Sequence, residues 1–115
     1  MALDRPIADY ETARTWQSGL TEQWGDEPDM TARFDALERF CVLTGRDPDA
    51  MIADCTRLVE TGKRIRIKAR REYSEKIAEF QAASGGTPRE QQKLGNTVRS
   101  FFIHNGIFMQ SGLAG

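Results

Sequence analysis

The sequence predicts an all-α protein, a compact bundle of four to five helices. Apolar residues recur at helical spacing through most of its 115 residues, and glycine or proline falls where one such stretch gives way to the next. No segment makes a convincing strand. A hydrophobic share of 39% and a charged share of 29% fit one globular domain with a core of moderate size.

The first helix is expected from about Ala8 to Trp24, and Gly25 is expected to end it. Its apolar positions lie at helical spacing: Ala13, Trp16, Leu20 and Trp24. Both tryptophans are interpreted as packing residues rather than as platforms for stacking. A polar, acidic loop at residues 26–29 then leads to the second helix.

The second helix is predicted to start near Thr31 and to end at Gly45, which has the position of a C-cap. Asp47 and Pro48 then supply an N-cap and a first helical residue for the third helix. The third helix is expected to continue to residues 61–62 because of the apolar stripe Met51, Ile52, Cys55, Leu58 and Val59.

The fourth helix is expected from about Lys63 to Ala83, with one face formed by Ile65, Ala69, Tyr73, Ile77 and Phe80. The fifth begins at Thr87-Pro88-Arg89-Glu90, which combines an N-cap threonine, a first-turn proline and a capping-box glutamate. Its apolar side contains Leu94, Val98, Phe101 and Phe102. Asn105-Gly106 is expected to close it with a left-handed cap.

The charges divide the chain into two opposed parts. Residues 1–62 hold 6 basic and 13 acidic residues (6 − 13 = −7), and residues 63–115 hold 10 basic and 4 acidic residues (10 − 4 = +6). The basic part opens with KRIRIKARR, residues 63–71. Such asymmetry indicates that one face of the protein binds a polyanion, most often nucleic acid or an anionic membrane. Alternatively, the basic residues simply form a solvent-exposed helix face. Arg64, Lys68 and Arg71 are expected to line one side of the fourth helix.

Catalytic constellations are missing from the sequence. His104, the only histidine, is expected in the last turn of a helix, and no serine or cysteine nucleophile is placed to use it. No zinc-protease, phosphate-loop or EF-hand motif occurs, so no metal and no cofactor are expected. The turn Ser84-Gly85-Gly86-Thr87 can bind a phosphate at a helix start, although it also simply connects two helices. We therefore expect a non-enzymatic chain.

Cys41 and Cys55 have no metal-type spacing and are interpreted as buried small hydrophobic residues rather than a disulfide or a regulatory thiol. Residues 1–10 lack the apolar core of a secretory signal, and no stretch is apolar enough to span a bilayer. The expected location is the cytoplasm.

Most of the chain resembles a known family. The residues that carry the likeness are Thr87-Pro88, Val98-Arg99-Ser100-Phe101-Phe102 and Asn105-Gly106-Ile107, together with Leu37-Glu38-Arg39-Phe40 upstream. In this order and spacing they resemble the amino-terminal, SAM-like core-binding domain of the tyrosine recombinases, the phage integrase family. The likeness covers residues 30–109. The basic stretch is longer than that pattern predicts between the middle helices.

The resemblance implies a helical bundle that forms one half of a clamp around double-stranded DNA and takes part in DNA integration and recombination. In the family a separate carboxy-terminal domain carries the catalytic arginines, histidines, lysine and tyrosine, and no counterpart occurs here. Tyr73 lies on the apolar seam and is not expected to be a nucleophile. The implied organisation is an N-terminal helix and acidic loop (1–29), the core-binding domain (30–109) and the start of a linker (110–115).

The expected DNA contacts lie on the fourth and fifth helices. Phosphate contacts are expected from Arg64, Arg66, Lys68, Arg70 and Arg71. A groove-facing set is expected from Arg89, Gln92, Lys93, Asn96 and Arg99, in which Gln92 and Asn96 suit adenine edges and the arginines suit guanine. Alternatively, Arg99 anchors its helix against Asp35 or Glu38. The expected partners are DNA and other recombinase protomers, with no membrane and no small-molecule substrate.

Two other functions remain open from the sequence. One is a helical protein–protein interaction module whose acidic half contacts the basic half of another copy. The other is a helix-turn-helix regulator, for which residues 83–87 allow the required short turn although no dimerisation element is evident.

Overall fold

A computed structural model describes residues 3–26 and 28–109 of the chain. These residues form the 3-10 turn η1 (Ile7–Asp9), helices α1 (Glu11–Trp24), α2 (Thr31–Thr44) and α3 (Pro48–Asp54), strands β1 (Thr56–Val59) and β2 (Gly62–Ile65), and helices α4 (Ile67–Ala83) and α5 (Pro88–His104). The predicted helical bundle is confirmed. The linker predicted at residues 110–115 lies outside the described residues.

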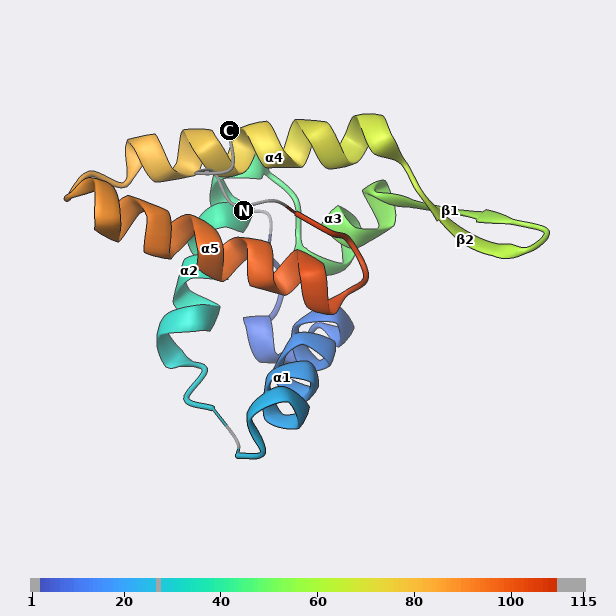
Figure 1. The fold of residues 1–115 in the computed structure, drawn as a ribbon, viewed down its shortest axis with the longest axis horizontal. Coiled ribbons are helices and arrows are strands. Elements are labelled where there is room, and N and C mark those ends of the chain that lie inside the picture. The colour runs from blue at the N-terminus through green and yellow to red at the C-terminus, as the bar shows by residue number, and fades with distance from the viewer. Residues whose placement is uncertain (1–2, 27, 110–115) are drawn as a thin grey trace.

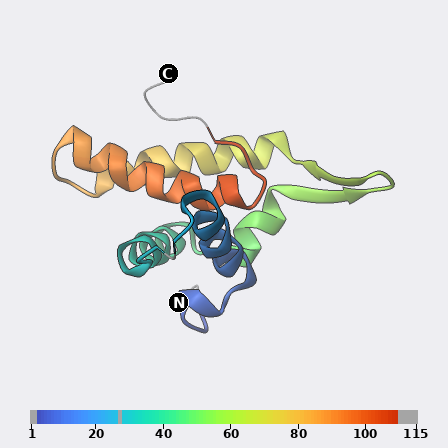
Figure 2. The same ribbon diagram turned by 60° about the horizontal axis from the view of Figure 1, so that its bottom comes forward.

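Helices α4 and α5 run antiparallel and side by side, and α1 and α2 pack beneath them (Figures 1 and 2). This arrangement is an αα-hairpin rather than the angled pair, at about 90–120°, of a helix-turn-helix. The β1–β2 hairpin projects from the amino-terminal end of α4, opposite the end at which α4 turns into α5. In the described part of the chain, no helix combines the length and apolar character needed to cross a membrane.

Several predicted boundaries are confirmed because their signals are local. Gly25 and Gly45 end α1 and α2 in the left-handed conformation, with φ of 79° and 72°. The Asp47 carboxylate accepts a hydrogen bond from the Ala50 backbone N–H at 2.7 Å. Thr87 forms the predicted capping box at the start of α5.

The predictions for residues 55–66 were wrong. Helix α3 ends at Asp54 and α4 begins only at Ile67, because the residues between them form the antiparallel β1–β2 hairpin. Val59 pairs with Gly62, and Gly62 has a φ of 127° that suits glycine at this turn. The β-branched residues Thr56, Val59 and Ile65 favour strands, and Ile65 and Ile67 alternate with basic residues in the two-residue period of a strand.

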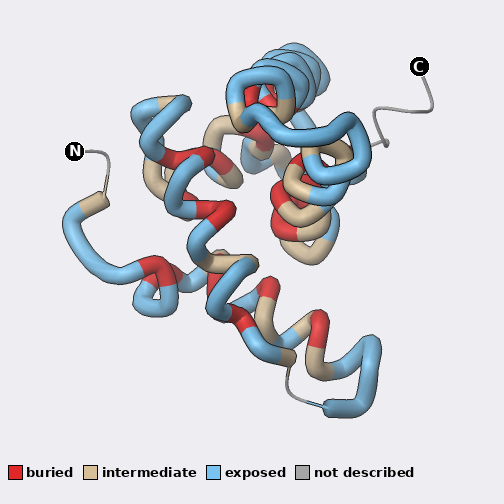
Figure 3. Tube along the Cα trace, turned by 90° about the vertical axis from the view of Figure 1, so that its left-hand side faces the viewer, coloured by how far each residue is buried: buried red, intermediate tan, exposed pale blue. Residues whose placement is uncertain are grey.

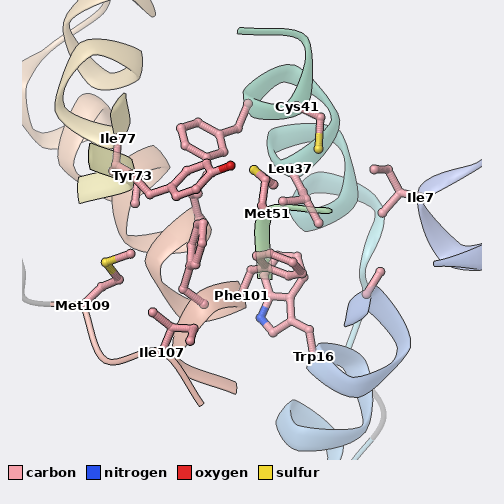
Figure 4. Close-up of a cluster of buried hydrophobic side chains, with 14 of the residues drawn as sticks. Ile7, Trp16, Leu37, Cys41, Met51, Tyr73, Ile77, Phe101, Ile107 and Met109 are labelled. Atoms are coloured by element: carbon pink, nitrogen blue, oxygen red, sulfur yellow. The ribbon is translucent and has the colours of Figure 1, made fainter. Parts of the chain in front are cut away.

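One hydrophobic core joins the elements from η1 to the residues after α5. Trp16 of α1 is fully buried and packs edge-on against Phe101 of α5 with 5.7 Å between the ring centroids. Figure 4 shows these two rings between Leu37 and Met51 on one side and Ile107 on the other. The buried positions lie on the inward sides of the helices (Figure 3). The interpretation of Trp16 as a packing residue is confirmed.

Two glycines allow α5 to approach its neighbours closely. A Cβ atom on Gly95 would lie 1.6 Å from the Gln81 side-chain oxygen of α4. A Cβ atom on Gly19 would lie 2.4 Å from the His104 ring, so α1 meets the end of α5 at that point. These contacts fix the position of α5 relative to α1 and α4.

Candidate nucleic-acid interface

A groove runs along the exposed side of α5 and has a volume of about 850 Å³. We call it the α5 groove. Its walls come from the end of α1, the start of α2, the end of α4 and most of the length of α5: Leu20, Trp24, Arg33, Gln81, Pro88, Arg89, Gln91, Gln92, Lys93, Asn96, Thr97 and Ser100. No aspartate or glutamate is among these lining residues. The groove therefore carries positive charge from Arg33, Arg89 and Lys93, although most of its lining surface is apolar.

Four of the residues predicted to face DNA meet in this groove. Gln92 and Lys93 each lie three or four residues from both Arg89 and Asn96, so the four residues share one side of α5. Arg89, Lys93 and Asn96 are exposed and Gln92 is half-buried. Among the described residues, neither Arg89 nor Lys93 forms an ion pair with a carboxylate. Their charges are therefore available to an anion.

Asn96 is held by its neighbours. Its Oδ1 atom accepts hydrogen bonds from Gln92 Nε2 at 3.2 Å and from Arg99 Nη1 at 2.9 Å. With Oδ1 occupied, the Asn96 amide presents N–H donors to the groove. This polarity suits an acceptor such as guanine O6 or N7 better than the paired donor and acceptor of an adenine edge.

Arg99 does not lie on the exposed side of α5. Only 5% of its surface is exposed, and it does not line the groove. Its guanidinium hydrogen-bonds Asn96, and its Nε atom has no partner among the described residues. No bond to Asp35 or Glu38 is present there. Burial lowers the pKa of Arg99. Its position fits a residue that orients Asn96 better than one that contacts DNA.

Trp24 is a groove residue that the sequence interpretation missed. It is 54% exposed, so its assignment to the packing residues was wrong. The Arg33 guanidinium lies over its ring at 5.0 Å from the centroid, and Arg33 also donates to the Asp29 carbonyl at 2.9 Å. The helical spacing of Trp24 resembled that of Trp16, but the last turn of α1 extends beyond the core.

The five cations predicted on the fourth helix do not form one stripe. Arg64 belongs to β2 and Arg66 is the N-cap of α4, so only Lys68, Arg70 and Arg71 are helical. Arg66 and Lys68 line a hollow of about 390 Å³ beside Tyr73. Arg70 and Arg71 line a different hollow, beside Phe108. The predicted alignment of Arg64, Lys68 and Arg71 was wrong because the helix starts three residues after Arg64.

The hairpin carries further cations, and we call residues 56–65 the basic arm. Arg57 of β1 is paired directly with Arg64 of β2, and Lys63 of β2 with Leu58 of β1. All four side chains are exposed. Within the described residues, Arg57, Lys63 and Arg64 have no ion pair. The basic arm projects from the amino-terminal end of α4, whereas the α5 groove is lined by the other end of α4 and by α5, α1 and α2, in a molecule whose longest dimension is 46 Å (Figure 1).

Asp54 fixes the base of the basic arm. Its carboxylate accepts hydrogen bonds from Arg46 Nη2 at 2.8 Å and from the Tyr73 hydroxyl at 2.5 Å. Burial alone would raise the pKa of Asp54, but the bonds from Arg46 and Tyr73 outweigh it and hold that pKa below its usual value. The Arg66 backbone N–H donates to the Cys55 carbonyl at 2.7 Å.

The remaining candidate groups have local roles. Cys41 and Cys55 are buried and unpaired, as predicted, and burial raises the pKa of Cys41 to about 12 and that of Cys55 to about 11.

His104 Nδ1 contacts the Ser100 carbonyl oxygen at 3.0 Å in the last turn of α5. Glu90 Oε1 accepts from the Thr87 backbone N–H at 3.3 Å, so a carboxylate occupies the helix start that a phosphate would need. Within residues 3–26 and 28–109, no three acidic, cysteine or histidine side chains come together as a metal site requires.

No protein-family model, curated protein or solved structure matches this chain.

Proposed function

We propose that this chain is a double-stranded-DNA-binding module and that the α5 groove is its main contact with the duplex. The observation that carries the proposal is the one-sided display of Arg89, Gln92, Lys93 and Asn96 in a groove without lining carboxylates. Cations of this kind bind phosphates, and amide groups hydrogen-bond base edges. The unpaired cations of the basic arm add a second region suited to a polyanion.

The resemblance of residues 30–109 to the core-binding domain of tyrosine recombinases supports a more specific role. In this proposal the chain clamps DNA in the cytoplasm, together with other protomers, for integration or recombination. A separate catalytic domain performs the chemistry, and the chain itself needs no metal or cofactor. Two features of α5 involve the residues that carry this resemblance. Thr87 caps the start of the helix, and Val98, Phe101 and Phe102 are buried in the core.

Charge reversal in the groove tests the proposal. The Arg89→Glu/Lys93→Glu variant is compared with Arg14→Glu/Arg39→Glu, which makes the same charge change at exposed positions outside the groove. Fluorescence anisotropy with a labelled duplex of about 30 base pairs, three helical turns, measures the affinity. The groove variant should bind at least about tenfold more weakly than the control, because two phosphate contacts are lost. Equal affinities would contradict the proposal, provided that both variants melt like the wild type.

A second candidate function is protein–protein interaction. It is favoured by an exposed apolar hollow of about 340 Å³ between α2 and the end of α4, where Val42 and Leu43 are exposed beside Phe80. Size-exclusion chromatography with and without duplex, at low and moderate salt, separates the two functions. Self-association without DNA that the Val42→Ser/Leu43→Ser variant abolishes would favour this candidate. Co-elution with duplex that weakens with salt would favour DNA binding.

A further inference from the structure

The basic arm is a two-stranded ribbon that leaves the body of the protein, as Figures 1 and 2 both show. Every residue from Glu60 to Arg66 is exposed, and so are Arg57 and Leu58. Leu58 is 79% exposed, so the hydrophobic core does not extend to this part of the arm. An isolated two-stranded hairpin is at best marginally stable, so the tethers at Asp54, Tyr73 and Arg66 hold the arm in position without covering its strands.

The strand register distributes cations to both faces of the ribbon. Directly paired residues share a face, so Arg57 and Arg64 lie together on one face and Lys63 lies with Leu58 on the other. Two arginines placed directly opposite each other repel and destabilise a hairpin. No carboxylate among the described residues neutralises this pair. An external anion would relieve that repulsion.

The tip of the ribbon has different chemistry from its sides. The turn between the paired residues Val59 and Gly62 consists of Glu60 and Thr61. A glutamate at the tip would be repelled by phosphates, but it suits the cytosine amino group on the floor of a major groove. A polar tip also disfavours insertion into a lipid bilayer, because the tip would enter the hydrocarbon first.

We propose that the basic arm enters the major groove of duplex DNA. In this arrangement Arg57 and Arg64 contact phosphates on one wall, Lys63 contacts the other wall, and the tip faces the base edges. A two-stranded ribbon fits a groove about 12 Å wide. Strands of four residues extend about 14 Å, which exceeds the groove depth of about 8.5 Å. The inference rests on the DNA-binding function proposed above and adds to it a second contact element and its mode of binding.

The arm and the α5 groove can contact one duplex. The arm projects from one end of α4 and the groove is lined by the other end of α4 and by α5, in a molecule whose longest dimension is 46 Å. One turn of DNA measures about 34–36 Å, so a duplex lying along that dimension would present successive stretches of its major groove to the two elements. The arm should extend the contacted length of DNA without being needed for binding at the α5 groove.

The test uses the full chain with a duplex of about 30 base pairs, three helical turns. The Arg57→Gln/Arg64→Gln variant should lower affinity about tenfold or more and reduce the steepness of log K against log salt by about 2, since two phosphate contacts are lost. Hydroxyl-radical footprinting should show two protected segments for the wild type, about 10 base pairs apart. The arm variant should lose protection at one segment and keep it at the other.

Two further variants sharpen the result. Glu60→Ala should change the sequences that the chain selects from a random duplex library at the arm segment while leaving the salt dependence unchanged. Arg14→Gln/Arg39→Gln has the same charge change as the arm variant and should leave the footprint intact. Removing the arginine pair should leave the melting temperature unchanged or raise it, so a loss of binding would not reflect unfolding.

Three outcomes would overturn the inference. In the first, the wild type binds the duplex and the groove variant binds it more weakly, but the arm variant keeps the wild-type affinity and footprint. The arm then has no DNA contact, while the proposed function stands. If the wild type binds no duplex, the proposed function fails and the inference fails with it. If the arm variant loses binding only to vesicles that contain phosphatidylserine, the arm contacts a membrane instead.

Discussion

The Tyr73 hydroxyl of α4 donates a 2.5 Å hydrogen bond to Asp54 Oδ2 at the end of α3. The Tyr73 ring lies in the core against Phe102, with 5.5 Å between the ring centroids. This one side chain therefore connects the base of the basic arm to the interior of the bundle. Tyr73→Phe should keep the ring packing and remove the bond, and so lower the free energy of unfolding by about 1.5–3 kcal/mol. Chemical denaturation measures this change.

A double-mutant cycle with Asp54→Ala, which leaves no acceptor at this position, gives the control for Tyr73→Phe. If the hydroxyl acts through Asp54, the two substitutions should not be additive, because either one removes the same hydrogen bond. Additive losses would show that Tyr73 stabilises the protein in another way.

The depressed pKa of Asp54 predicts a pH dependence. The folded-state pKa lies below the unfolded-state value, so the carboxylate stabilises the fold above its unfolded pKa, near 3.8. This contribution should disappear as the pH falls through the folded pKa. Wild type should therefore lose more stability between about pH 5 and pH 3 than Asp54→Asn does. Parallel pH profiles for the two proteins would contradict the assignment.

Whether Gly95→Ala stabilises or destabilises the protein should depend on Gln81. Replacing glycine by alanine within a helix normally stabilises it by about 1 kcal/mol. Here the new methyl group would overlap the Gln81 side chain, so Gly95→Ala alone should give no such gain and should destabilise the protein if Gln81 cannot move. In a Gln81→Ala background the same substitution should recover the expected gain. Thermal melting of the four proteins checks this, and an equal effect in both backgrounds would argue against the close contact.

Arg99 is predicted to position Asn96 rather than to bind phosphate. Arg99→Met keeps the volume of the side chain and removes a buried cation that has no carboxylate partner among the described residues. The melting temperature should stay the same or rise, because that cation is poorly compensated. The salt dependence of DNA binding should not change, whereas losing a phosphate contact would reduce its slope by about 1. Binding should become less selective for sequence once Asn96 is released.

The parts of the fold with strong local signals could be predicted from the sequence. Helix α5 is one such part, because Thr87, Pro88 and Glu90 define its start and Val98, Phe101 and Phe102 define its buried side. The hairpin was missed because Ile65 fits a helical face with Ala69 and Tyr73 as well as a strand with Ile67. The bond between Asp54 and Tyr73, 19 residues apart, contributes to the choice between these structures, and no local pattern contains it.

The sequence predicted several residues of the candidate site, but not how the helices come together to form the groove. Arg89, Gln92, Lys93 and Asn96 could be found because they share one side of a helix. Arg33 and Trp24 could not, since they reach the groove only through the packing of α1 and α2 against α5. Arg99 was placed with the exposed residues because it is charged, but its turn of α5 is buried.

A salt titration of duplex binding tests the central claim most directly. If the groove and the arm together neutralise about five phosphates, log K should fall against log salt with a slope of about −4 to −5. The groove variant Arg89→Glu/Lys93→Glu should have a slope less steep by about 2. A wild-type slope near zero, or one that the groove variant leaves unchanged, would contradict DNA binding through this surface.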